Sequence, residues 1–395
     1  MPENVNTIFE YTDRLKKLPP YLFARIDKIK QEEIAKGRKL IALGIGDPDL
    51  PTPQFVIDRL AAASKKPSNH QYPSYSGMIE FRKAVARWYQ NRFNVKLNPE
   101  NEVLALVGSK EGIAHIPLAF VNPGEATLVP DPGYPVYATA TAFAGGTPLH
   151  FSLREKNDYL PDFAELEALV KKGPRVRLLF LNYPNNPTSA SASLEFFKEV
   201  VAFAKKHQII VCHDNAYSEI FFDGKKQPSF LEVPGAMDVG CEFHSLSKTF
   251  NMTGWRVGFL VGNAKIVAGL GQVKTNIDSG TFNAVQEAGI EALDRYEPFC
   301  TELRSIYQER RDVLIPALQA LGLQCRKPDA TFYAWARLPE GQRSEDFTLN
   351  LIRTKGIVST PGNGFGAAGE GYVRFTLCSD ISILKQVAQA LQGSV

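Results

Sequence analysis

The sequence predicts an α/β fold with a mainly parallel central sheet. Short β-branched runs alternate with longer helical patterns across residues 46–290, the order expected of a chain that crosses back over a parallel sheet. No internal repeat or low-complexity linker interrupts this order. The chain has 395 residues, more than a single core usually contains, so we expect a second lobe.

The individual elements follow from local patterns. Apolar runs predict strands at residues 103–107, 126–129, 177–181, 209–213, 240–244 and 257–261, and the helices between them include 78–93 and 193–206. The pattern then changes to a long charged helix at 295–321, two antiparallel strands within 330–338 and 371–378, and a helix at 382–391. Because residues 22–36 are also helical in pattern, we expect them to pack with the C-terminal part. The predicted domains are a large one at 46–290 and a smaller, discontinuous α+β domain formed by 1–45 and 291–395.

Composition excludes several classes of protein. The 45 basic and 42 acidic side chains nearly balance, and no basic run indicates a nucleic-acid partner. The five cysteines include no CxxC pair, so neither a zinc site nor a disulfide framework is implied. The polar first residues lack an apolar signal core, and no stretch has the length of a membrane helix. We therefore expect a cytoplasmic protein.

One loop between two predicted strands has the chemistry of a cofactor site. Residues 243–259 hold one lysine, several hydroxyls, and an arginine eight residues after the lysine. Pyridoxal phosphate (PLP) needs these groups, because an amine such as Lys248 bonds to it while hydroxyls and the planar guanidinium of Arg256 hold its phosphate. An isolated Ser-x-x-Lys would more often be a solvated loop. The string Ser245-x-Ser247-Lys248 followed by Thr253-Gly-Trp-Arg-Val-Gly258 is far more specific.

A second segment supplies a carboxylate. The apolar run 209–213 ends at Asp214, and Tyr217 follows three residues later. A carboxylate beside the pyridine nitrogen of PLP keeps that nitrogen protonated, so that the ring can accept electrons from the substrate. An Asp after a strand also commonly caps the next helix, and the segment alone supports both interpretations.

Two further segments are suited to binding anions. Gly108-Ser109-Lys110 follows a predicted strand and starts a helical pattern, where free N–H groups can point at a phosphate. Arg374 lies on a predicted strand among apolar neighbours. A buried arginine needs a partner, so a carboxylate should meet it, either from a substrate or from an internal salt bridge.

Together these segments resemble the class I/II aminotransferases, and the resemblance covers the chain from about residue 21 to residue 374. It implies fold type I of the PLP-dependent transferases, with a mainly parallel seven-stranded sheet, and transfer of an amino group between an amino acid and a 2-oxo acid. It implies that Lys248 forms the Schiff base with PLP and moves the substrate proton. In the same way it gives the ring nitrogen to Asp214 and the phosphate to Ser245 and Arg256.

The resemblance also assigns residues around the ring and the substrate. It implies that Asn186 donates to the ring oxygen, near Tyr217, and that Tyr134 stacks on the ring. It implies that Arg374 binds the substrate α-carboxylate with help from the backbone of Gly46. The predicted cofactor residues are Ser109, Lys110, Tyr134, Asn186, Asp214, Tyr217, Ser245, Lys248, Arg256 and Tyr72, and the predicted substrate residues are Tyr21, Gly46, Lys110, Asn186, Asn283 and Arg374.

The resemblance further implies a homodimer with shared active sites, in which Tyr72, Tyr21 and Asn283 reach across to the partner. Three segments, starting at Leu18, Gly108 and Ser279, look like those of LL-diaminopimelate aminotransferases within the family. This implies transfer from LL-diaminopimelate to 2-oxoglutarate, a step of lysine biosynthesis. The sequence departs from the plant-type pattern at Tyr75, where those enzymes carry a glutamate.

Alternative functions remain open from the sequence. Aspartate, alanine, aromatic amino acids or methionine could be the donor. A PLP-dependent carbon–sulfur lyase or an aminocyclopropane-carboxylate synthase shares the fold and these residues, and fold alone does not settle the reaction. A PLP-binding transcription regulator would need a DNA-binding domain ahead of the fold, whereas here the fold signals begin by about residue 21.

Overall fold

A seven-stranded sheet forms the centre of the computed structural model, which describes residues 9–16 and 24–392. Its strands are β2 Val103–Leu106, β3 Ala126–Asp131, β4 Thr147–Ser152, β5 Val176–Asn182, β6 Ile210–Asp214, β7 Gly240–Ser245 and β8 Gly258–Gly262. They lie in the order β2-β8-β7-β6-β5-β3-β4. Only β8 runs antiparallel to its neighbours, and the other neighbouring pairs are parallel. The mainly parallel sheet of the α/β prediction is therefore confirmed.

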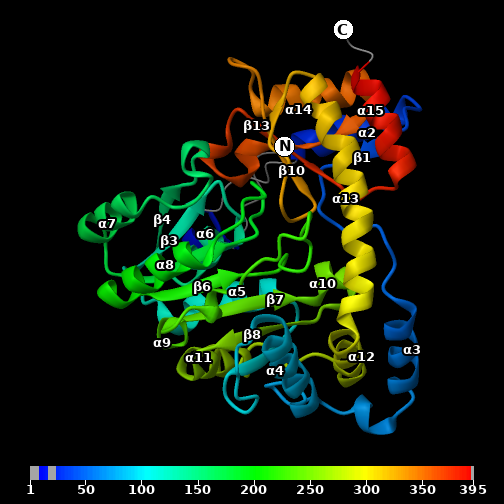
Figure 1. The fold of residues 1–395 in the computed structure, drawn as a ribbon. Helices are drawn as coiled ribbons and strands as arrows, with labels where there is room; N and C mark the ends of the chain where they lie inside the picture. Colours follow the sequence, from blue (N-terminus) through cyan, green and yellow to red (C-terminus); the bar gives the residue numbers. More distant parts are fainter. Residues whose placement is uncertain (1–8, 17–23, 393–395) are drawn as a thin grey trace.

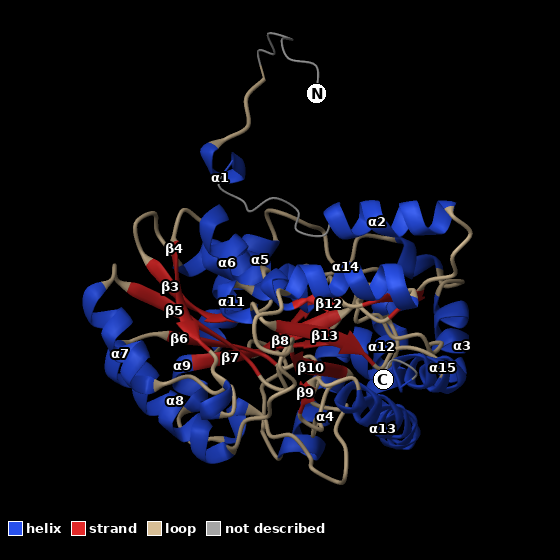
Figure 2. Cartoon of the chain, turned by 90° about the horizontal axis from the view of Figure 1, so that it is seen from above, coloured by secondary structure: helices blue, strands red, loops and turns tan. Residues whose placement is uncertain are grey.

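Helices cover both faces of this sheet (Figure 2). One face carries α5 Ser109–Phe120, α6 Val136–Phe143 and α11 Ala264–Lys274, and the other carries α4 Ile79–Phe93, α8 Leu194–His207 and α12 Asn283–Asp294. Strand β5 shows why polar and apolar residues do not alternate along the central strands, since both faces of the sheet are covered by helices. Leu178 and Phe180 pack with the first group of helices, while Leu179 and Leu181 pack with the second. The remaining helices in this part are α3 Gln54–Ala63, α7 Phe163–Lys172, α9 Ala236–Val239 and α10 Leu246–Thr249.

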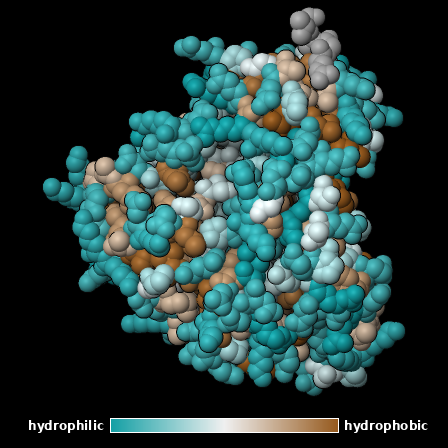
Figure 3. All heavy atoms as spheres, viewed as in Figure 1, coloured by the Kyte–Doolittle hydropathy of each residue, from teal (hydrophilic) through white to brown (hydrophobic). Residues whose placement is uncertain are grey.

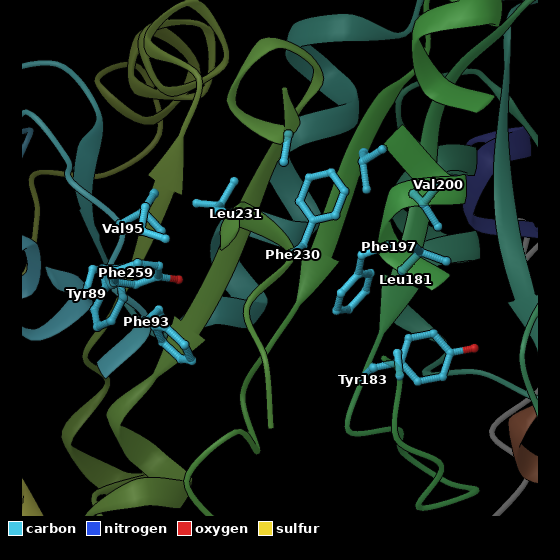
Figure 4. Close-up of a cluster of buried hydrophobic side chains, with 14 of the residues drawn as sticks. Tyr89, Phe93, Val95, Leu181, Tyr183, Phe197, Val200, Phe230, Leu231 and Phe259 are labelled. Carbon is cyan, nitrogen blue, oxygen red and sulfur yellow. The ribbon is translucent and has the colours of Figure 1, made fainter. Parts of the chain in front are cut away.

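Aromatic side chains fill much of the buried layer between β-strands and helices. In Figure 4, Tyr89, Phe93 and Phe259 gather at one place and Phe197 and Phe230 at another. The ring centroids of Tyr89 and Phe93 are 5.2 Å apart, and those of Phe197 and Phe230 are 5.8 Å apart. Burying each ring contributes about 1.5–3 kcal/mol of transfer free energy, so this layer fixes the strands whose ends carry the site.

A smaller antiparallel sheet organises the rest of the chain, in the order β12-β13-β10-β9. Its strands are β9 Gln324–Cys325, β10 Tyr333–Arg337, β12 Thr360–Pro361 and β13 Tyr372–Thr376. Helix α13, Tyr296–Ala320, runs from beside α12 to this smaller sheet (Figure 1). Around it lie α2 Ala24–Ala35, α14 Ser344–Lys355 and α15 Ile381–Gln392, and β1 Ile41–Ala42 pairs in parallel with β11 Ile357–Val358. Helix α1, Asp13–Lys16, projects away from these elements in Figure 2. Division of the chain at residues 46 and 290 stays a prediction.

The strands that the sequence predicts in the large sheet are all present, with ends shifted by at most two residues. The sequence does not predict β4, whose residues include Pro148 and several partly exposed positions. Proline and exposure are tolerated there because β4 is an edge strand.

The face of the molecule seen in Figure 3 is mostly hydrophilic, with hydrophobic residues gathered in separate groups. Within residues 9–16 and 24–392, no helix is both long enough and apolar enough to cross a membrane.

Candidate active site

The site lies where three neighbouring parallel strands end. Asn182, Asp214 and Ser245 are the last residues of β5, β6 and β7, and these strands are adjacent in the sheet. Ligands of open α/β sheets bind at the carboxyl ends of the strands. The sheet thus brings together side chains that are far apart in the sequence.

A cavity of about 430 Å³ opens at this edge. Most of the predicted site residues line it: Gly46, Ser109, Lys110, Tyr134, Asn186, Asp214, Tyr217, Ser245, Lys248, Arg256 and Arg374. Tyr72 and Asn283 are absent from its lining, and Tyr21 lies outside the residues that the structure describes. Tyr72 is 89% exposed and lines a separate surface hollow with Gly280 and Phe282.

Positive charge dominates the cavity. Lys110, Lys248, Arg256 and Arg374 line it, but Asp214 is the only carboxylate among the described lining residues. In the part of the chain that the structure describes, none of the four cations forms an ion pair with an acidic side chain. An anionic ligand is therefore what this arrangement is suited to bind.

A helix N-terminus and an arginine beside it make part of the cavity suited to an anion such as a phosphate. Helix α5 begins at Ser109, so its free N–H groups face the cavity there. Gly108 has a φ of +81°, and a Cβ at this position would overlap the guanidinium of Arg256. Arg256 is itself held by the carbonyls of Thr253 and Val107, which accept hydrogen bonds at 2.9 and 3.3 Å. The glycine thus allows the arginine and the helix terminus to face the same anion.

Asp214 is buried, and only one of its two carboxylate oxygens has a hydrogen-bond partner among the described residues. Its Oδ2 accepts a 2.8 Å hydrogen bond from the hydroxyl of Tyr137, but its Oδ1 has no partner among the described residues. Burial raises the pKa of Asp214 to about 6, although the hydrogen bond from Tyr137 acts in the opposite direction. A protonated pyridine nitrogen would pair with the free oxygen and remove this penalty. Asp214 is followed by turns rather than a helix, so the capping interpretation does not apply.

Tyr137 is expected to support cofactor binding through Asp214. Tyr137→Phe should raise the pKa of Asp214 further and weaken PLP binding roughly tenfold at neutral pH, because a hydrogen bond to a charged group contributes about 1.5–3 kcal/mol. Titration of the cofactor-free protein with PLP measures the dissociation constant. The matched control is Tyr183→Phe, which removes a buried phenol that donates to the carbonyl of Tyr159 outside the cavity. Equal PLP affinity in Tyr137→Phe and the wild type would contradict the assignment.

Lys248 points into the same cavity. Its Nζ donates to the carbonyl oxygen of Gly46 at 3.0 Å, and it lies 5.7 Å from the ring centroid of Phe332. Burial lowers the pKa of Lys248, which makes a neutral amine more available at neutral pH. A neutral amine is the form that attacks an aldehyde or accepts a proton.

Arg374 is held in place without a carboxylate. It donates to Asn186 Oδ1 at 2.6 Å and to the carbonyl of Gly44 at 2.7 Å, and its Nε has no partner among the described residues. Because Asn186 uses its oxygen for Arg374, its amide NH2 is left to donate to a ligand. The internal salt bridge left open by the sequence is not seen in residues 9–16 and 24–392, which favours a substrate carboxylate as the partner.

Several lining residues were not among the predicted site residues, and Asn182, Tyr333 and Phe365 are the most informative of them. Asn182 connects two loops, since its amide donates to the Asp214 carbonyl at 2.7 Å and its Oδ1 accepts from the Asn186 backbone at 2.7 Å. A polar residue at the end of an apolar strand was a usable signal for it. Tyr333 and Phe365 also line the cavity, but no local pattern shows which side of the smaller sheet faces the site.

Since the cavity offers a partner for each polar end of PLP, fold and site together define a PLP-dependent enzyme. A comparison with family models gives the family: the model described as aminotransferase class I and II matches residues 38–391. The chain belongs to this family, as the sequence motifs predict. PLP is its cofactor, and it transfers amino groups between amino acids and 2-oxo acids.

Relatives and solved structures agree with this placement. LL-diaminopimelate aminotransferase of Maridesulfovibrio salexigens is 55% identical over 99% of each chain. The enzyme of the same name from Aquifex aeolicus is 53% identical over 98% of this chain and 99% of that one. Substrate-bound BacF from Bacillus subtilis superposes with a TM-score of 0.92 at 38% identity, over 98% of both chains. A probable N-succinyldiaminopimelate aminotransferase from Thermus thermophilus gives 0.89 at 36% identity, over 94% of this chain and 100% of that one.

Proposed function

We propose that the chain transfers an amino group from LL-diaminopimelate to 2-oxoglutarate, with tetrahydrodipicolinate as the cyclised ketone product, in lysine biosynthesis. One observation carries this substrate assignment: curated relatives at 50–55% identity over nearly the whole chain are named LL-diaminopimelate aminotransferase.

The cavity supports a substrate with charge at both ends. We assign Arg374, which lines the cavity together with Gly46, to the α-carboxylate at the reacting end. LL-diaminopimelate carries a second ammonium and carboxylate at its far end, and 2-oxoglutarate carries a carboxylate alone there. Lys110 lies in the cavity, 5.9 Å from the ring centroid of Tyr134, and is a candidate donor for that carboxylate. We assign Tyr21 and Asn283 to the same end.

The cofactor assignments follow from the positions of the side chains. We assign the phosphate to Ser109, Lys110, Ser245 and Arg256, the ring face to Tyr134, and the ring oxygen to Asn186 and Tyr217. When bound, PLP withdraws electrons from the substrate Cα. Asp214 holds a proton on the ring nitrogen, which sustains that withdrawal. Lys248 would accept the proton from the substrate Cα and return it to the cofactor carbon. Arg374 keeps Cα within reach of the Lys248 amine.

A panel of amino donors tests the substrate. With 2-oxoglutarate as acceptor, kcat/KM for LL-diaminopimelate should exceed that for aspartate, alanine, aromatic amino acids, methionine and N-succinyl-LL-diaminopimelate by tenfold or more. Tenfold corresponds to about 1.4 kcal/mol in transition-state binding, which one extra charged contact can supply. A tenfold preference for any other donor overturns the substrate assignment and leaves the family unchanged.

We also propose a homodimer with shared active sites. Tyr72 is 89% exposed and does not line the cavity of its own chain, but a second copy could present it to the phosphate. The surface hollow that Tyr72 lines is also lined by Gly280 and Phe282, which lie just before Asn283 in the chain. We infer the same cross-subunit role for Tyr21 and Asn283. The expected location is the cytoplasm.

Subunit mixing tests the shared site. A Tyr72→Phe homodimer has two weakened sites, and a Lys248→Ala homodimer has two dead ones. A hybrid has one intact site and one doubly damaged site, so mixing should recover about half of the wild-type activity per hybrid. Exchange is verified by mass spectrometry of differently tagged chains. Activity that stays at the average of the two parent dimers after complete exchange would show that each site is built from one chain.

A further inference from the structure

We propose that Tyr333 is a positioning residue of this reaction: its hydroxyl orients Tyr217, and its ring holds the guanidinium of Arg374. The inference rests on the roles proposed above for these two partners. Tyr333 is the first residue of β10 and is 3% exposed. It reaches the cavity from the smaller sheet, whereas Tyr217 follows strand β6 of the large sheet.

The hydroxyl contact has a required direction. The oxygens of Tyr333 and Tyr217 are 3.1 Å apart, and either could be the donor in the protein alone. Each phenol has one proton, and burial raises the pKa of both, so both stay protonated at neutral pH. Once Tyr217 donates its proton to the ring oxygen of PLP, it can only accept from Tyr333. The donated hydrogen bond polarises the Tyr217 hydroxyl and fixes its direction.

The ring contact restrains Arg374. The guanidinium carbon lies 4.2 Å from the ring centroid of Tyr333 and 4.5 Å from that of Phe365. Two of its nitrogens donate to Asn186 and Gly44, as described above. Contacts with two aromatic rings and two hydrogen bonds leave the planar cation little freedom to rotate, so it meets a carboxylate without further ordering.

Two hydrogen bonds fix the backbone of Tyr333 beside the site. Its carbonyl accepts a hydrogen bond from the Ser189 hydroxyl at 2.8 Å, and its N–H donates to Thr331 Oγ1 at 3.1 Å. A Cβ at Gly46 would overlap the Tyr333 hydroxyl, so the backbone at Gly46 packs directly against it. These contacts leave one place for the phenol, between the two residues it positions.

Two substitutions separate the hydroxyl from the ring. In PLP-loaded Tyr333→Phe, the pH midpoint of the cofactor absorbance should rise by roughly half a unit, because a weaker hydrogen bond to the ring oxygen lets the cofactor hold its proton to higher pH. KM for the amino donor should stay within about twofold, since the ring over Arg374 remains. Tyr333→Leu should give the same raised midpoint as Tyr333→Phe, because both variants lack the hydroxyl. It should also raise KM for the amino donor about tenfold, the effect of losing one buried cation–π contact.

Tyr217→Phe and the double variant complete the test. Tyr217→Phe should raise the midpoint further, and adding Tyr333→Phe to it should change nothing more. Tyr307→Phe is the matched control, because it removes a buried hydroxyl of the neighbouring core, 3.8 Å from Cys378 Sγ. An unchanged midpoint in Tyr333→Phe, with a clear shift in Tyr217→Phe, overturns this inference alone. An unchanged midpoint in Tyr217→Phe overturns the role of Tyr217 and this inference with it.

Discussion

Replacement of Lys248 by alanine is expected to lower the rate of transamination by at least about 10³-fold. The variant loses both the amine that bonds to PLP and the base that moves the Cα proton. Burial in the cavity lowers the pKa of Lys248, and its Nζ donates a hydrogen bond to the carbonyl of Gly46. Single-turnover absorbance with the amino donor in excess measures the rate of the chemical step apart from binding.

Lys248→Arg is the matched control for charge. It keeps a cation that can bind Gly46, but a guanidinium does not release its proton in proteins, so it cannot act as the base. We expect it to be as slow as the alanine variant. Turnover of Lys248→Ala within tenfold of the wild type would remove Lys248 from the mechanism. Substantial activity in Lys248→Arg but not in Lys248→Ala would show that Lys248 acts only as a fixed charge.

Asp214→Asn is expected to keep the fold and lower kcat by roughly 10²-fold or more. A neutral amide cannot hold a proton on the ring nitrogen, so the ring withdraws electrons less strongly. The same change should stabilise the cofactor-free protein. Burial raises the pKa of Asp214 to about 6, so the ionised carboxylate destabilises the cofactor-free fold.

The pH dependence gives this prediction a sign. Below the usual pKa of an aspartate, Asp214 is protonated in both the folded and unfolded states, and it carries no penalty. The penalty grows as the pH rises toward 6 and is complete above it. Cofactor-free Asp214→Asn should therefore melt at a higher temperature than the cofactor-free wild type at pH 8, and at a similar temperature near pH 4. Near-normal kcat, or a lower melting temperature at pH 8, would contradict the account of Asp214.

Sequence patterns predicted the parts of the site that belong to single segments. Asp214, Ser245 and the Gly108-Ser109 turn each sit at the end of an apolar run, and parallel strands must bring such ends to one edge. The resemblance then supplied roles that no local pattern contains. The Schiff-base assignment of Lys248 is of this kind.

Residues contributed by the smaller sheet were harder to predict. Tyr333 belongs to a strand in which every residue but the last is buried, so its pattern does not show which face meets the site. Phe365 ends a short 3-10 helix, Gly362–Phe365, whose place depends on how the smaller sheet packs against the large one. Tyr72 and Asn283 do not line the cavity of their own chain, so the roles proposed for them require a second copy, which no local sequence pattern indicates.

The most direct test of the account is one half-reaction followed by its reversal. PLP-loaded enzyme is mixed with LL-diaminopimelate in the absence of any 2-oxo acid, and products are counted per subunit. The account predicts about one equivalent of tetrahydrodipicolinate, no ammonia, and a stably aminated cofactor that 2-oxoglutarate then restores with release of about one equivalent of glutamate. Release of ammonia, or no reaction with LL-diaminopimelate while another amino acid completes the cycle, would contradict it.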